Sequence, residues 1–148
     1  MEYVRHIRKT DLARNTRQVI NAVLRGQTAV VESHGEPEVA IMDIVDYRIM
    51  RAVMHYHAQR PEIDVKAGLS DREATAASDP QERFNLVMHH YLAGAISLAR
   101  AAELLHLPWL DLRTRCLRLD VPLRAAPADL AQAKEDVQVA EAWTPTPQ

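Results

Sequence analysis

Cysteine, glycine and long apolar runs are scarce in this chain. Its 148 residues include one cysteine, Cys116, and four glycines. A single cysteine cannot form an internal disulfide, which favours the reducing environment of the cytosol. So few glycines leave no glycine-rich loop of the kind that binds phosphates. No apolar run approaches the roughly 20 residues of a membrane-spanning helix, and no apolar core follows the first basic residues as in a signal peptide. We therefore expect a cytoplasmic protein with no membrane partner.

Charge is nearly balanced overall but unevenly distributed. The chain has 18 Lys and Arg against 20 Asp and Glu, a net charge of −2, which by itself argues against a nucleic-acid-binding protein. Residues 1–25, however, contain six basic and two acidic residues. A local basic face can bind phosphate in a chain that is acidic as a whole. Ordinary scatter of surface charge is the alternative explanation.

Residues 1–58 have the pattern of a small α+β unit in the order strand, helix, strand, strand, helix. Residues 3–8 are expected to form the first strand. One helix is expected to begin at Thr10 or Asp11, both good N-cap residues, and to end at Gly26. The apolar stripe of this helix consists of Leu12, Val19, Ile20, Val23 and Leu24.

Two further strands and a second helix complete this unit. β-Branched residues predict strands at 28–33 and 39–44, and residues 34–37 predict a tight hairpin turn between them. Asp43 is expected to cap the second helix. A unit of this size buries little surface, so we expect a homodimer or a higher oligomer. The expected apolar face of the second helix consists of Tyr47, Met50, Val53 and Met54.

A linker and an all-α unit are expected next. Residues 59–80 are polar, acidic and bounded by prolines, which predicts a linker with a helical turn after Ser70. Residues 81–123 predict three helices in the order of a helix-turn-helix, the second capped by Ser97 and the third beginning at Pro108. The expected buried residues of this unit are Phe84, Val87, Met88, Tyr91, Leu92, Leu98, Ala101, Ala102, Leu105, Trp109, Leu112, Cys116 and Leu119.

The last part of the chain, residues 124–148, is acidic and rich in alanine and proline. It has too few apolar residues for a core, so we expect either disorder or a helix that forms on a partner.

The first expected helix and the strand before it present a polar face suited to DNA. Arginine can form two hydrogen bonds to guanine or to phosphate, and asparagine or glutamine can do the same with adenine. A solvated helix face is the alternative. The candidate DNA contacts on this face are Arg5, Arg8, Arg14, Arg17, Gln18 and Asn21.

The element order of residues 1–57, with the segments 11–15, 30–37 and 39–47, resembles the Phd/YefM (prevent-host-death) family of antitoxins. The resemblance implies a unit that forms dimers, binds operator DNA and represses its own operon. It also implies that the C-terminal part of the chain neutralises a toxin. By this resemblance Arg14, at the start of the expected helix, is the leading candidate for a DNA contact. The next candidates are Arg8, Asn15 and Arg17. Some relatives have a basic residue near the hairpin, where this chain has an acidic one, Glu32.

Residues 91–105 (YLAGAISLARAAELL) and 119–122 (LDVP) are similar to a family of small predicted helix-turn-helix proteins that are regarded as antitoxins. Their partners are often thought to be PIN-domain nucleases, so the resemblance implies a PIN-domain ribonuclease as the toxin. Asp111 shares the outer face of the third helix and would repel phosphate unless it accepts a bond from cytosine. A role in packing or dimerisation alone is the alternative. The expected DNA contacts on that helix are Arg113, Thr114, Arg115 and Arg118.

Together, the two resemblances imply an antitoxin of a type II toxin–antitoxin system that binds its toxin directly and represses its own operon. Toxin binding is expected in the tail, with residues 59–80 as the second choice. A stand-alone DNA-binding regulator and a protein–protein adaptor are the alternatives. The expected toxin contacts are Leu130, Val137, Val139 and Trp143.

The remaining candidates for chemistry are weaker. The histidines His55, His57, His89 and His90 come without a carboxylate or a cysteine at ligand spacing, so no metal site is expected. Cys116 lies on an apolar stripe and is expected to be a buried structural thiol. We find no catalytic set of residues, and we expect neither an enzyme nor a cofactor.

Overall fold

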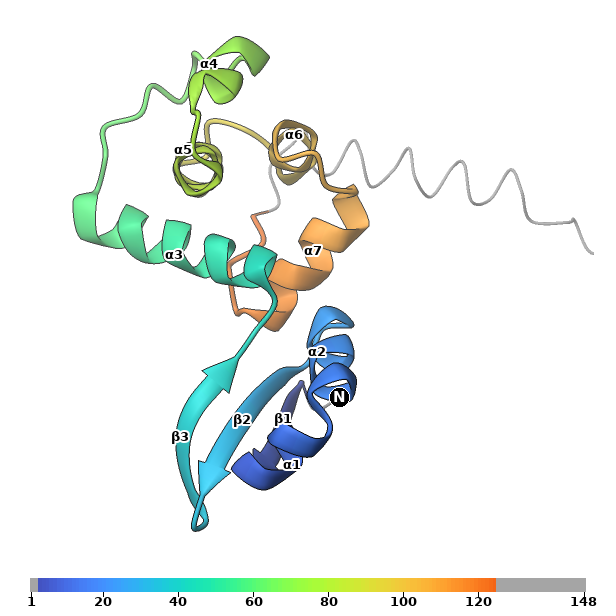
Figure 1. Ribbon diagram of the computed structural model, residues 1–148. Coiled ribbons are helices and arrows are strands. Elements are labelled where there is room, and N and C mark those ends of the chain that lie inside the picture. The colour runs from blue at the N-terminus through green and yellow to red at the C-terminus, as the bar shows by residue number, and fades with distance from the viewer. Residues whose placement is uncertain (1–2, 125–148) are drawn as a thin grey trace, which may run out of the picture. The chain divides into compact units, whose positions relative to one another are not determined.

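The computed structural model describes residues 3–124 and has a mixed α+β architecture (Figure 1), as the sequence predicts. The chain divides into two compact units, Met1–Met50 and Arg51–Gln148, and the boundary falls inside a helix. No helix in the described range is both long enough and apolar enough to cross a membrane.

The first unit is a three-stranded sheet with two short helices. The central strand β2 is parallel to β1 and antiparallel to β3. The helices lie together beside the sheet in Figure 1, between β1 and β2 in the chain. In chain order the elements are β1 (Val4–Arg8), α1 (Lys9–Arg14), α2 (Thr16–Leu24), β2 (Thr28–Ser33), β3 (Glu36–Ile41) and the beginning of α3 (Ile44–Gln59).

The core of the first unit is small. Side chains alternate across a strand, so Ile7, Ala29 and Val31 share the sheet face that packs against the helices. From α2, Val19 and Val23 complete this buried cluster. The other members of the predicted α2 stripe differ, because Ile20 and Leu24 are 41% and 60% exposed.

The prediction of one continuous helix after β1 is wrong. The helix is broken at Asn15, whose φ of −125° and ψ of 36° lie outside the helical region. After the break, the Thr16 hydroxyl donates a hydrogen bond of 2.8 Å to the carbonyl of Leu12. The N-cap of α1 is Arg8 rather than Thr10 or Asp11, which lie inside the helix. The apolar spacing did not indicate the break, because it fits one helix equally well.

The hairpin is tighter than predicted. Its loop is the pair His34–Gly35, and both have a positive φ, 53° and 79°, as a type I′ turn requires. The strand expected at 39–44 is therefore observed at Glu36–Ile41. This strand includes Pro37, which is tolerated because β3 is an edge strand with a local shift in its pairing.

Helix α3 begins as predicted but buries a different face. The Asp43 carboxylate accepts hydrogen bonds from the amides of Val45 and Asp46 at 2.8 and 3.3 Å, which confirms the expected cap. Ile49 and Ala52 are fully buried. The predicted apolar face is instead largely exposed, with exposed fractions of 39% for Tyr47, 38% for Met50 and 63% for Met54.

In its described part, the second unit contains helices and no strand. Besides the rest of α3, it contains α4 (Asp71–Ala76), α5 (Pro80–Leu92), α6 (Leu98–Leu104) and α7 (Trp109–Arg118). The segment expected as a linker, 59–80, includes α4 and buries Leu69 and Ala74. Of the residues predicted to be buried in this unit, Trp109 and Leu119 are partly exposed and the rest are buried.

Side chains cap the helices of the second unit. Ser70, Asp79 and Ser97 accept hydrogen bonds of 3.0 to 3.3 Å from backbone amides in the first turns of α4, α5 and α6. The helical turn after Ser70 and the Ser97 cap are thus confirmed. Pro108 is the N-cap of α7 rather than its first helical residue, which corrects the prediction by one position.

Candidate nucleic-acid interface

The break between α1 and α2 brings most of the predicted DNA contacts of the first unit together. Arg14 is the last residue of α1, Asn15 lies in the break, and Arg17 and Gln18 belong to the first turn of α2. All four side chains are exposed. We call residues 14–18 the α1–α2 corner. It presents two guanidinium groups and two amide side chains within five consecutive positions.

The N-terminus of α2 adds a feature that the sequence did not predict. Asn15 forms no side-chain cap, and the first turn of α2 contains no acidic residue. A helix N-terminus carries a partial positive charge and amide N–H groups that point along the axis. Because none of these is neutralised by a local carboxylate, the end of α2 and the two arginines beside it favour a phosphate. The prediction of one continuous helix had hidden this helix end.

Arg5 and Arg8 are not brought together. They lie three positions apart on or at the end of β1, so their side chains point to opposite faces of the sheet. Arg8 is 77% exposed, and its Nε donates to the Asp11 carboxylate at 3.0 Å. Part of the charge of Arg8 is therefore already used within the unit, whereas Arg5 is exposed on the face that also carries Ile7.

The acidic residue near the hairpin has a partner in the same unit. Nδ1 of His6 lies 2.7 Å from the carboxylate of Glu32, which joins β1 to β2 across the sheet. His34, at the hairpin loop, is exposed. Because the Glu32 carboxylate is hydrogen-bonded to His6, it would repel a nearby phosphate less strongly than the sequence alone suggested.

Helix α7 presents only part of its predicted DNA-binding face. Arg113 and Thr114 are exposed, while Arg118 is partly buried. The side chain of Arg115 is only 14% exposed, and its Nε donates to the Asp111 carboxylate at 3.0 Å. This ion pair neutralises the Asp111 carboxylate, which the sequence predicted would repel phosphate. The same pair also removes Arg115 from the outer surface of α7.

Apolar side chains occupy the rest of the outer surface of α7. Leu110 and Leu117 are 65% and 50% exposed. The Thr114 hydroxyl donates to the Leu110 carbonyl at 2.8 Å, so its proton is already engaged within the helix. Two exposed leucines beside one available arginine make α7 a poorer match for DNA than the α1–α2 corner.

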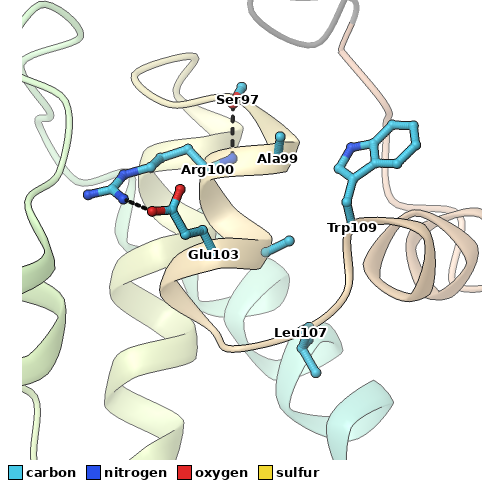
Figure 2. Close-up of a pocket in the computed structure, with 7 residues that line it drawn as sticks. Ser97, Ala99, Arg100, Glu103, Leu107 and Trp109 are labelled. Atoms are coloured by element: carbon cyan, nitrogen blue, oxygen red, sulfur yellow. Dashed lines mark hydrogen bonds and ion pairs between the residues drawn. The ribbon is translucent and has the colours of Figure 1, made fainter. Parts of the chain in front are cut away.

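A hollow of about 450 Å³ lies where the turn between α6 and α7 meets these helices. In Figure 2, the side chains of Arg100 and Glu103 extend from α6 away from the Trp109 indole. Arg100 pairs with Glu103 at 2.9 Å. The Ser97 hydroxyl accepts the amide hydrogen bond that caps α6. No histidine or cysteine lines the hollow, and its one carboxylate, Glu103, is held in the ion pair with Arg100. The lining residues are Ser97, Ala99, Arg100, Ala102, Glu103, Leu107 and Trp109.

The structure also bears on the other residues that the sequence analysis singled out. Cys116 is fully buried, as expected for a structural thiol. Within residues 3–124, no group of three or more His, Cys, Asp or Glu side chains is arranged to hold a metal ion. The predicted toxin contacts lie outside the described residues, namely Leu130, Val137, Val139 and Trp143.

Comparisons of the chain with protein-family models, with curated proteins and with solved structures found no match.

Proposed function

We propose that the protein is an antitoxin-type repressor whose first unit binds operator DNA through the α1–α2 corner. The observation that carries this proposal is the position of four exposed residues, Arg14, Asn15, Arg17 and Gln18, at the uncapped start of α2. Arginine supplies charge to phosphates and bidentate bonds to guanine, while the amides can read adenine. In this arrangement the helix end positions the unit on the backbone and the side chains select the sequence.

Self-association of the first unit is part of this proposal. The buried core of this unit consists of a few residues from one sheet face and one helix, which is little for a unit of about fifty residues. Several large apolar side chains remain exposed within residues 3–50, and a second copy of the unit would cover them. A homodimer, or a higher oligomer built from it, would then read two half-sites related by its two-fold axis. These exposed residues are Tyr3, Val4, Ile20, Leu24, Val39, Ile44, Tyr47 and Met50.

The antitoxin half of the proposal concerns the tail. Residues 125–148 contain four acidic residues and one basic residue, a composition that suits binding to the basic nucleic-acid site of a ribonuclease. The resemblance of residues 91–105 and 119–122 to antitoxins favours a PIN-domain ribonuclease as the cognate toxin. In this account the protein acts in the cytoplasm by binding, without catalysis.

The proposed operator binding is tested by measuring the affinity of the full chain for two duplexes. One is DNA from upstream of its own gene, and the other is a scrambled duplex of the same composition. We expect binding to the upstream DNA to be at least about a thousandfold tighter than to the scrambled duplex. With about six phosphate contacts, affinity should fall by about a thousandfold between 50 and 200 mM salt. Equal affinity for the two duplexes would contradict operator recognition.

The toxin half is tested by co-expressing the chain with the products of its neighbouring genes and purifying it. We expect one neighbour to co-purify with the full chain and to be lost when residues 123–148 are deleted. Retention after the deletion would contradict the assignment to the tail. Specific DNA binding without any co-purified neighbour would favour the stand-alone regulator instead.

A further inference from the structure

Two histidines from distant parts of the chain meet in the second unit. His55 lies on α3 and His89 on α5, and Nδ1 of His55 is 3.2 Å from Nε2 of His89. Their rings are nearly parallel, with an interplanar angle of 10° and centroids 5.0 Å apart. His89 is only 8% exposed, whereas His55 is on the surface. The pair therefore links a buried ring of α5 to an accessible ring of α3.

Whether the hydrogen bond between His55 and His89 can form depends on how many protons the two rings carry. An N···N hydrogen bond needs a hydrogen on one nitrogen and a lone pair on the other. A pair that is neutral or carries one extra proton satisfies this condition. When both rings are cationic, both facing nitrogens carry hydrogen, the bond is lost and two like charges stand about 3 Å apart.

The surroundings of His89 do not favour its charged form. Its pKa is lowered from 6.5, first by burial and then by the charges of His55 and His90, while a hydrogen bond with the Ala52 backbone acts in the opposite direction. On α3, the ring of Tyr56 lies 5.7 Å from that of His89. On α5, Nδ1 of His90 is bonded to the Leu86 carbonyl at 2.8 Å. No carboxylate is among the groups that act on His89 within the described chain.

We propose that the His55–His89 pair is a proton-sensitive latch that holds the C-terminal part of α3 on α5 at neutral pH and releases it in mild acid. Nothing in this inference depends on DNA or toxin binding. A histidine whose folded form resists protonation stabilises the fold fully above pH 6.5, the value for the unfolded chain. That stabilisation is lost as the pH falls from 6.5 through the lower value of the folded protein. The buried ring then gains its proton at the expense of the α3–α5 contact.

The test is amide hydrogen exchange of residues 52–59 in the full chain at pH 7.5 and pH 5.0, corrected for the intrinsic pH dependence of exchange. In the wild-type protein we expect protection of these residues to drop by about tenfold or more at pH 5.0. The variant His55→Asn should weaken this response, because an amide can donate to a neutral His89 or accept from a charged one, and only the effects of burial and of His90 then remain. The matched control His57→Asn changes an exposed histidine on the same helix and should keep the wild-type response.

A second measurement keeps the test independent of how well the variants fold. NMR titration of the wild-type rings gives the pH at which His89 gains its proton, and loss of protection in 52–59 should share that midpoint. The latch is contradicted if protection is the same at both pH values, or if His55→Asn responds as the wild type does. It is also contradicted if the midpoint of opening follows the carboxylates near pH 4 and not His89.

Discussion

The two units of this protein differ in the size of their cores and in how their helices begin. In the second unit, side chains cap α4, α5 and α6, and the helices bury large residues such as Tyr91, Met88 and Leu112. In the first unit, α2 begins without a cap, the core is small, and large apolar side chains lie on the surface. The uncapped start of α2 and the exposed apolar side chains of the first unit are therefore accessible to partners.

This difference indicates where binding and where stability reside. An uncapped helix end with nearby arginines costs stability but provides a site for phosphate. A capped helix end with a filled core adds stability but provides no such site. In the second unit, the Tyr91 hydroxyl also adds stability, because it donates to the Pro122 carbonyl at 2.8 Å and joins the chain after α7 to α5. We therefore propose that the first unit binds DNA and that the second contributes mainly a folded framework.

The largest effect is expected in the core of the second unit. Leu112 on α7 is completely buried, so Leu112→Ala should lower the free energy of unfolding by about 2–5 kcal/mol through lost burial and a new cavity. Leu117→Ala, on the same helix but half exposed, should change it by less than about 0.5 kcal/mol. Urea denaturation measures both variants. Equal losses would show that α7 does not pack as described.

Self-association should depend on the apolar surface of the first unit. Leu24→Glu places a carboxylate where a second copy is expected, and we expect the dimer dissociation constant to rise by about a hundredfold, because an unpaired charge would be buried. Leu117→Glu, an exposed leucine of the second unit, serves as the control and should leave the constant unchanged. Analytical ultracentrifugation over a range of concentrations measures both. The reverse order of effects would assign the dimer contact to α7.

DNA affinity should depend on the α1–α2 corner. Arg14→Ala should weaken binding to the upstream DNA by about 1–3 kcal/mol, which is about 5- to 150-fold, if the arginine reads a base. Arg25→Ala removes the same charge from the other end of α2 and should have a much smaller effect. Fluorescence anisotropy gives both affinities. If the two variants lose affinity equally, only the overall charge of the unit matters.

The smallest expected effects concern the helix caps. Ser97→Ala should cost about 1 kcal/mol of stability, because it removes the hydrogen bond to the Arg100 amide at the start of α6. Asn15→Ala should cost only a few tenths, since the side chain of Asn15 caps nothing. Thermal unfolding monitored by circular dichroism compares them. A larger loss for Asn15→Ala would mean that α2 is capped after all.

Much of the second unit could be predicted from the sequence. Apolar residues at helical spacing predicted its buried stripes, and Ser97 predicted the start of α6, because capping and periodicity are local properties. The pairing of His55 with His89 could not be predicted, because it joins residues 34 positions apart. Arg115 was expected on the outer face, but its bond to Asp111 one helical turn away keeps it packed.

The first unit was less predictable at the point that matters most for its proposed function. The composition of residues 14–18 predicted a polar face, but the helix break at Asn15 depends on backbone angles that the pattern does not encode. The apolar face of α3 was also misjudged, because Tyr47 and Met54 fit the helical spacing as well as the buried Ile49 does. Only tertiary packing distinguishes these faces.

The central claim is that the first unit, and not α7, binds the operator. The most direct test compares two charge-matched double variants of the full chain, Arg14→Ala with Arg17→Ala and Arg113→Ala with Arg118→Ala, by their affinity for the upstream DNA at one salt concentration. Each pair removes two positive charges, so the loss from charge alone is the same. We predict a loss of affinity of about thirtyfold or more for the first pair and of about threefold or less for the second. A larger loss for the second pair would contradict the central claim and assign DNA binding to α7.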